Sequence, residues 1–119
     1  MARNAGAIID AETKAVVARI VGYRRPKRII LFGSRGRGDS KPDSDIDLCV
    51  LYDHLERHNV EVLEELYLEI WGLNARPGGA NNTGPVDLVV YDENIFTDRS
   101  RRPNSFESII EKEGLTVYG

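Results

Sequence analysis

The chain has 119 residues, a mass of 13.3 kDa and a formal net charge of −3. Apolar residues make up 41% and charged residues 29%, which is typical of a folded domain and excludes a disordered chain. The sequence has no apolar run of about 18 residues and no signal-peptide pattern, and its single cysteine excludes a disulfide framework. We therefore expect one cytoplasmic domain over residues 1–119 that makes no membrane contact, and the negative charge disfavours nucleic acid as a ligand.

The first half of the chain combines one helical pattern with two short apolar runs. Residues 7–21 carry apolar side chains at helical spacing, and Gly22 is the expected end of that helix. Residues 28–32 and 45–52 are short apolar runs that predict strands. Between these strands, residues 33–44 have the Gly, Ser, Asp and Pro content of a loop.

The second half begins with a longer helical pattern. Residues 56–73 carry an apolar stripe, with Tyr67 and Trp71 on it as core residues. Residues 74–84 contain three glycines and three asparagines and form a candidate lid, and residues 85–91 predict a third strand. The remaining predicted elements are short helices over 93–101 and 105–113 and an edge strand over 115–118.

Three aspartates stand near the starts of predicted strands. Asp45 and Asp47 are two residues apart, so their side chains point to the same face of the second strand, and Asp87 lies near the start of the third strand. Three carboxylates at one site repel one another unless a cation lies between them. An all-oxygen ligand set suits Mg²⁺ or Mn²⁺ rather than zinc. We therefore predict a metal site, with Asp87 as a ligand or as a base toward an attacking hydroxyl.

A phosphate-binding turn is the expected complement of this metal site. Gly33 directly follows the first strand and lets a phosphate approach the backbone, and Ser34 adds a hydroxyl and an amide donor. Arg35 and Arg37 are candidates for phosphate contacts, although solvent exposure is equally typical of arginine. A phosphate site facing a metal predicts nucleotidyl transfer. If the turn and the aspartates share one site, the first two strands are antiparallel and the second and third are parallel. The predicted fold class is thus α/β (α+β), a small mixed sheet with helices packed against it.

The segment GSRGRGDSKPDSDIDLCV resembles the signature of the DNA polymerase beta-like nucleotidyltransferase superfamily. In that signature, Gly-Ser follows a strand and precedes an Asp-x-Asp pair in an apolar strand, and Asp87 in PVDLV matches the third carboxylate of the family. The form G-S-R-x-R-G followed by S-D-I-D-L is especially similar to the minimal nucleotidyltransferases, the antitoxins of HEPN–MNT toxin–antitoxin pairs. That group often has alanine where this chain has Gly36, which we expect to be a minor departure.

This resemblance implies a nucleotidyltransferase fold, Mg²⁺ or Mn²⁺ as the metal, and ATP as the nucleoside triphosphate. It implies that AMP is transferred to a HEPN toxin partner, which silences the toxin. Larger relatives carry an additional domain for the acceptor, so a second copy or a separate protein would complete the site in a homo- or hetero-oligomer. Two alternatives stay open, namely an antitoxin that neutralises its partner by binding alone and a nucleotidyltransferase that acts on a small-molecule hydroxyl or an RNA 3′ end.

Overall fold

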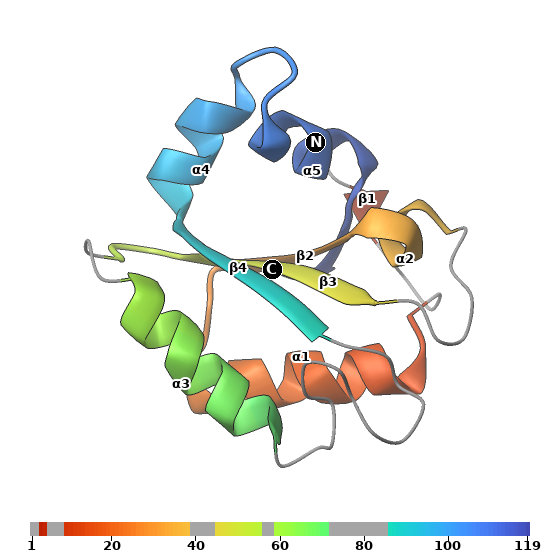
Figure 1. The fold of residues 1–119 in the computed structure, drawn as a ribbon, viewed down its shortest axis with the longest axis vertical. Helices are drawn as coiled ribbons and strands as arrows, with labels where there is room; N and C mark the ends of the chain where they lie inside the picture. Colours follow the sequence, from red (N-terminus) through yellow and green to blue (C-terminus); the bar gives the residue numbers. More distant parts are fainter. Residues whose placement is uncertain (1–2, 5–8, 39–44, 56–58, 72–85) are drawn as a thin grey trace.

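The computed structural model describes residues 3–4, 9–38, 45–55, 59–71 and 86–119. A central sheet separates two layers of helices (Figure 1). The strands are β1 (Arg3–Asn4), β2 (Arg28–Phe32), β3 (Ile46–Tyr52), β4 (Val86–Asp92) and β5 (Leu115–Tyr118). The helices are α1 (Ala11–Tyr23), α2 (Gly33–Arg37), α3 (Asn59–Trp71), α4 (Glu93–Ser100) and α5 (Phe106–Glu113). Helices α1 and α3 cover one face of the sheet and α4 and α5 the other, as Figure 1 shows. Within these ranges no helix has the length and apolar character to cross a membrane.

The sheet is mixed, as predicted, and its strand order is β1-β5-β2-β3-β4. Strands β2 and β3 are antiparallel, and β3 and β4 are parallel. The prediction that residues 115–118 form an edge strand is wrong, because β5 lies between β1 and β2. Strand β1 has only two residues, and its sequence carries no apolar alternation by which it could be predicted.

Helix α1 passes through Gly22 and ends at Tyr23, so the prediction that Gly22 ends the helix is wrong. A glycine ends a helix by adopting a positive φ, and Gly22 is not among the residues with that conformation. Asp10 begins the helix as its N-cap, and its side chain accepts a hydrogen bond from the Thr13 N–H. The cost of one glycine in a helix, about 1 kcal/mol, is small enough for packing to outweigh it.

The predicted loop over residues 33–44 begins with the short helix α2, and residues 39–44 lie outside the described residues. Gly38 ends α2 with a φ of 85°, a left-handed conformation typical of a helix C-terminus. Gly36 is buried, and a Cβ on it would lie 2.5 Å from the Leu31 carbonyl oxygen. Gly36 therefore allows α2 to pack against β2, and an alanine at this position would force a shift.

The two faces of the sheet bury different sets of side chains. Alternate residues of β3 point to opposite faces, so Leu48 contributes to one core and Cys49 to the other. The α1/α3 core includes Val16, Ile20, Ile29, Leu31, Ile46, Leu48, Val50, Leu66, Ile70, Val86 and Leu88. The prediction that Trp71 is a core residue is wrong, because its side chain at the end of α3 is 52% exposed. The α4/α5 core is smaller and contains Ile30, Cys49, Leu51, Phe96 and Ile110. Asp47 has the same parity as Cys49, so it lies on the α4/α5 face, beyond the end of the smaller core.

Candidate functional site

The structure brings the three predicted aspartates together. Asp47 on β3 and Asp87 on β4 are paired in register on neighbouring parallel strands, so their side chains share one face. Asp45 precedes β3 and lies two residues before Asp47. One carboxylate oxygen from each of the three residues lies within 4.8 Å of the other two. The lid candidate at residues 74–84 lies outside the described residues.

The electrostatic environment of the three aspartates favours a bound cation. Burial, the charges of Asp87 and Asp45 and a hydrogen bond with Asp87 together raise the pKa of Asp47 to about 6, against the opposing charge of Arg37. Three carboxylates this close are mutually repulsive as anions, and a divalent cation between them would replace repulsion with attraction. Their donor atoms are all oxygen, the set that Mg²⁺ and similar hard cations prefer. The three aspartates therefore fit a divalent metal ion.

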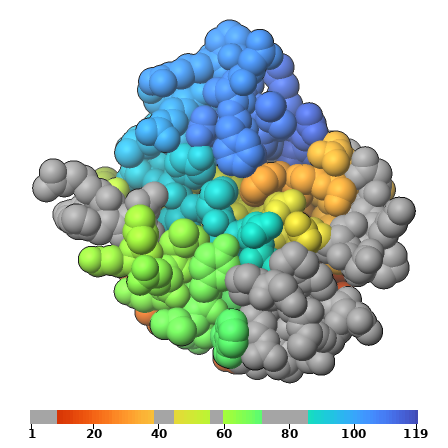
Figure 2. All heavy atoms as spheres, in the orientation of Figure 1, coloured from red at the N-terminus to blue at the C-terminus, as the bar shows by residue number. Residues whose placement is uncertain are grey.

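Gly33 places the start of α2 directly against this cluster. Its neighbour Phe32 pairs with Asp47 across the antiparallel strands, and Gly33 turns the chain with a φ of 69°. A Cβ on Gly33 would lie only 2.2 Å from the Oδ2 atom of Asp47. Glycine is thus required here for both the turn and the close approach, and Ser34 follows it as the next residue of α2. In the space-filling view, α2, β3 and β4 meet on one surface (Figure 2).

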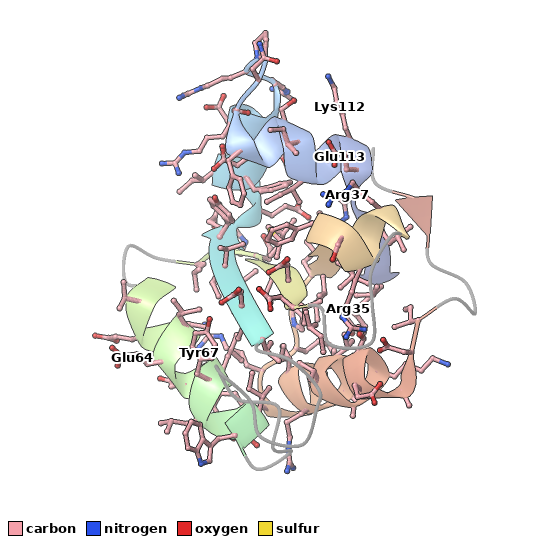
Figure 3. All side chains as sticks on the ribbon, turned by 45° about the vertical axis from the view of Figure 1, so that its right-hand side comes forward. Arg35, Arg37, Glu64, Tyr67, Lys112 and Glu113 are labelled. Atoms are coloured by element: carbon pink, nitrogen blue, oxygen red, sulfur yellow. The ribbon has the colours of Figure 1, made fainter. Side chains whose placement is uncertain are left out.

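The two arginines of α2 have different surroundings, although the sequence predicts the same phosphate-binding role for both. The Arg35 side chain is only 7% exposed and makes an ion pair with Asp10. The Arg37 side chain is 46% exposed, lies 3.6 Å from Glu113, and lowers the pKa of Asp47 against the effect of burial. Arg35 points toward α1 and Arg37 lies beside Glu113 (Figure 3). Arg37 is therefore the arginine of α2 whose charge opposes the raised pKa of Asp47.

Two further residues support the site and were not among the predicted site residues. The Tyr67 hydroxyl oxygen accepts a hydrogen bond of 2.9 Å from the backbone N–H of Leu88, the residue after Asp87. Among the described residues, strand β4 is the last strand of the sheet, so this contact from α3 satisfies a backbone donor on the side of β4 away from β3. Asp10 is the second such residue. Its place before a helix predicts an N-cap, but no local pattern predicts an ion pair with Arg35, which is 25 residues away.

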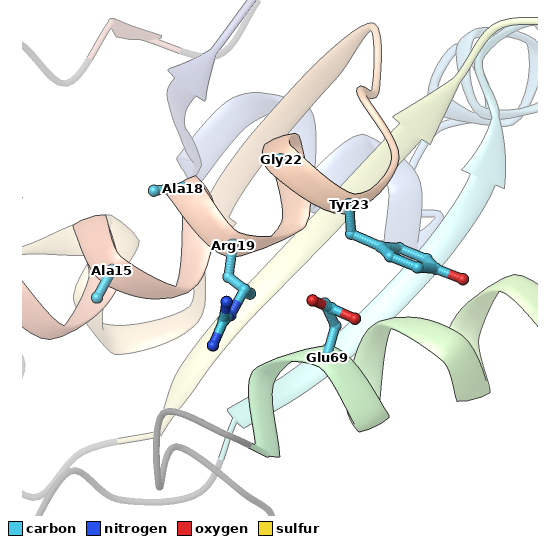
Figure 4. Close-up of a pocket in the computed structure, with 6 residues that line it drawn as sticks. All are labelled: Ala15, Ala18, Arg19, Gly22, Tyr23 and Glu69. Atoms are coloured by element: carbon cyan, nitrogen blue, oxygen red, sulfur yellow. The ribbon is translucent and has the colours of Figure 1, made fainter.

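A groove on another part of the molecule lies away from the aspartates. It has a volume of about 630 Å³ and runs between α1 and α3, with Arg19, Tyr23 and Glu69 on its walls and Ala15, Ala18 and Gly22 along α1 (Figure 4). These helices cover the face of the sheet opposite to that of Asp47. Because the groove brings no cluster of metal-binding side chains together in the described residues, the aspartates remain the candidate chemical site.

Comparison with family models matches residues 12–114 to a family described as nucleotidyltransferase domain. The matched segment contains Gly33, Ser34 and all three aspartates. A search of the curated proteins finds no match. The family match and the mixed sheet with packed helices agree, so the predicted DNA polymerase beta-like nucleotidyltransferase fold is confirmed.

Proposed function

The chain belongs to the nucleotidyltransferase domain family, and on that premise we propose that it transfers AMP from ATP to a hydroxyl group of a protein partner. The convergence of three carboxylates beside Gly33 is the observation that carries this proposal. In the reaction, the acceptor oxygen forms a bond to the α-phosphorus while the bond from that phosphorus to the bridging oxygen breaks. Pyrophosphate leaves, and the proton of the acceptor hydroxyl passes to a base.

The residues of the chain have distinct roles in this proposal. Asp45, Asp47 and Asp87 would hold Mg²⁺ or Mn²⁺, which when bound supplies charge stabilisation to the triphosphate and the leaving pyrophosphate. The Ser34 hydroxyl and the Gly33 backbone contact the triphosphate. Asp87, at the start of β4, acts as a ligand or accepts the proton of the attacking hydroxyl.

The partner in this proposal is a HEPN toxin, and the chain acts as its antitoxin. The support is the resemblance of G-S-R-x-R-G and S-D-I-D-L to the minimal nucleotidyltransferases of HEPN–MNT pairs. Transfer of AMP adds a bulky, charged group to the toxin. A modification near the active site of the toxin would block substrate access, so catalysis by this chain would silence its partner.

Labelled transfer tests the proposal directly. The purified chain is incubated with ATP labelled at the α-phosphate, Mg²⁺ and the product of the neighbouring gene as the candidate HEPN partner. We expect label on the HEPN protein, and we expect Asp45→Asn and Asp47→Asn to reduce labelling by about 10³-fold or more, because each removes a metal ligand. The matched control is Asp98→Asn, which makes the same change in an exposed ion pair on α4.

The outcomes separate the proposal from its alternatives. Neutralisation of the toxin without label, unchanged in the Asp45→Asn and Asp47→Asn variants, would show an antitoxin that works by binding. Label on a small-molecule hydroxyl or on an RNA 3′ end would retain nucleotidyl transfer and replace the acceptor. A lack of label on every acceptor, with ATP and Mg²⁺ present, would contradict the enzymatic proposal.

A further inference from the structure

Arg35 is held in a way that does not suit a ligand for phosphate. Its side chain is 7% exposed, and its guanidinium group forms an ion pair with the carboxylate of Asp10. A buried guanidinium that already faces a carboxylate has its charge compensated and its donors directed away from solvent. The view in Figure 3 shows Arg35 extending from α2 toward α1. The contact therefore joins two elements of the chain.

Asp10 uses both carboxylate oxygens in structural contacts. Its Oδ1 atom accepts a hydrogen bond of 2.8 Å from the Thr13 N–H, which caps α1, and its Oδ2 atom meets Arg35. Burial raises the pKa of Asp10, but the hydrogen bonds from Thr13 and the charge of Arg35 outweigh that effect and lower the pKa overall. Asp10 is therefore ionised at neutral pH and anchored to the first turn of α1.

Helix α2 needs such an anchor because it has only five residues. A helix of that length is not stable by its own hydrogen bonds, so tertiary contacts must hold it. Gly36 packs against the backbone of β2 on one side, and Arg35 reaches α1 on another. Gly33 and Ser34 belong to the same short helix, and Gly33 lies against Asp47. Any movement of α2 would thus move the turn relative to the aspartates.

We infer that Arg35 is a positioning residue that acts through Asp10 to hold Gly33 and Ser34 beside the aspartates, and that it does not bind the triphosphate itself. This inference rests on the proposed nucleotidyl transfer. The two arginines of α2 then have different roles. Arg35 fixes the turn, and Arg37, half exposed and electrostatically coupled to Asp47, is the arginine that faces the substrate.

A double-mutant cycle distinguishes positioning from phosphate binding. Asp10→Asn keeps a side chain that can cap α1 but removes the charge, and Arg35→Gln removes the other partner. We expect each variant to lower kcat about tenfold, because small displacements in an active site are costly, while KM for ATP changes by less than about threefold. The double variant should be no slower than either single variant, since both remove the same contact.

Arg37→Gln supplies the contrasting pattern. We expect it to raise KM for ATP about tenfold and to combine multiplicatively with Asp10→Asn, because the two residues act separately. Arg35→Lys keeps the charge and should retain more activity than Arg35→Gln. The inference is overturned if Arg35→Gln raises KM as Arg37→Gln does while Asp10→Asn leaves both constants unchanged.

A measurement without catalysis keeps this test separate from that of the proposed function. Amide hydrogen exchange over residues 33–37 should accelerate about threefold in Asp10→Asn and in Arg35→Gln, because α2 loses its anchor. The control Asp98→Asn, in an exposed ion pair on α4, should leave this exchange unchanged. If the chain transfers no nucleotide but exchange accelerates, the proposed function fails and the anchoring stands. Unchanged exchange in both variants overturns the anchoring.

Discussion

The two faces of β3 show how one strand can build both a core and a site. On the face toward α1 and α3, Ile46, Leu48 and Val50 are completely buried. On the face toward α4 and α5, Cys49 and Leu51 are buried in the same way, but Asp47 is partly exposed. Strand alternation alone would make the two faces equivalent. The difference therefore comes from the helices that cover them.

The covering helices differ in length. Helices α1 and α3 have 13 residues each, whereas α4 and α5 have eight each. At a rise of 1.5 Å per residue, the longer helices extend about 20 Å and the shorter ones about 12 Å, against about 23 Å for the seven-residue strand β3. In the described residues, the aspartates lie at the end of this face that the five-residue helix α2 flanks, and they are exposed or partly exposed there. The site lies where the helices over the sheet are short.

The largest expected effect on stability tests the face of the sheet that α1 and α3 cover. Leu48→Ala removes a completely buried side chain from the α1/α3 core and should lower the free energy of unfolding by about 3 kcal/mol. Leu68→Ala makes the same change at a leucine of α3 that is 76% exposed, and should change it by less than about 0.5 kcal/mol. Chemical denaturation measures both. Equal effects would contradict the view that this face is a continuous core.

A smaller effect on stability tests how closely α2 packs against β2. Gly36→Ala would bring a Cβ within 2.5 Å of the Leu31 carbonyl oxygen, and the resulting overpacking should cost about 2 kcal/mol. Gly22→Ala is the matched control, because a Cβ there meets no atom within 4 Å, and it should stabilise the protein by about 0.5 kcal/mol. Thermal and chemical denaturation measure both changes. A neutral Gly36→Ala would show that α2 can shift without cost.

The next substitution is expected to stabilise the protein rather than destabilise it, and it concerns the aspartates. The pKa of Asp47 is about 6 in the folded protein and near 3.8 without its surroundings, so folding opposes its ionisation. The free-energy cost of ionising Asp47 in the folded protein is absent below about pH 4 and is complete above about pH 6. At pH 7.5 with a chelator, Asp47→Asn should therefore raise the free energy of unfolding by about 1 kcal/mol, allowing for solvent screening.

The same variant should lose its response to a divalent cation. Adding Mg²⁺ should raise the melting temperature of the wild-type chain, because binding to the folded state stabilises it, and should do so much less in Asp47→Asn. Differential scanning fluorimetry measures this shift. A destabilised Asp47→Asn variant in chelator would contradict mutual repulsion among the aspartates.

The smallest effect concerns the anchor of α2. Because the folded pKa of Asp10 is lowered from 3.8, its contribution to stability is present at neutral pH and is lost as the pH falls through the folded value. Asp10 is partly exposed, so Asp10→Asn should cost less than about 1 kcal/mol at pH 7, and the difference should shrink as the pH falls below 3.8. Melting curves across this range measure it. A difference that is independent of pH would contradict an ionic contribution.

Local patterns were sufficient to predict most elements and the three aspartates that the structure brings together. The strands containing Leu31 and Leu48 follow from short apolar runs, and the spacing of Asp45 and Asp47 sets both side chains on one face. The hypothesis that the Gly-Ser turn and the aspartates share one site was enough to predict that β2 and β3 are antiparallel. These features succeed because each depends on neighbours a few residues away.

Contacts between distant segments were decided only by the folded chain. The sequence by itself determined that three aspartates and a glycine turn exist at strand ends, because alternation and glycine conformation are local properties. The tertiary structure decided that Arg35 meets Asp10 rather than the open surface, that β1 makes β5 an interior strand, and how much of each sheet face the helices cover. Those outcomes depend on strand order and on burial of whole faces, which no short stretch of sequence encodes.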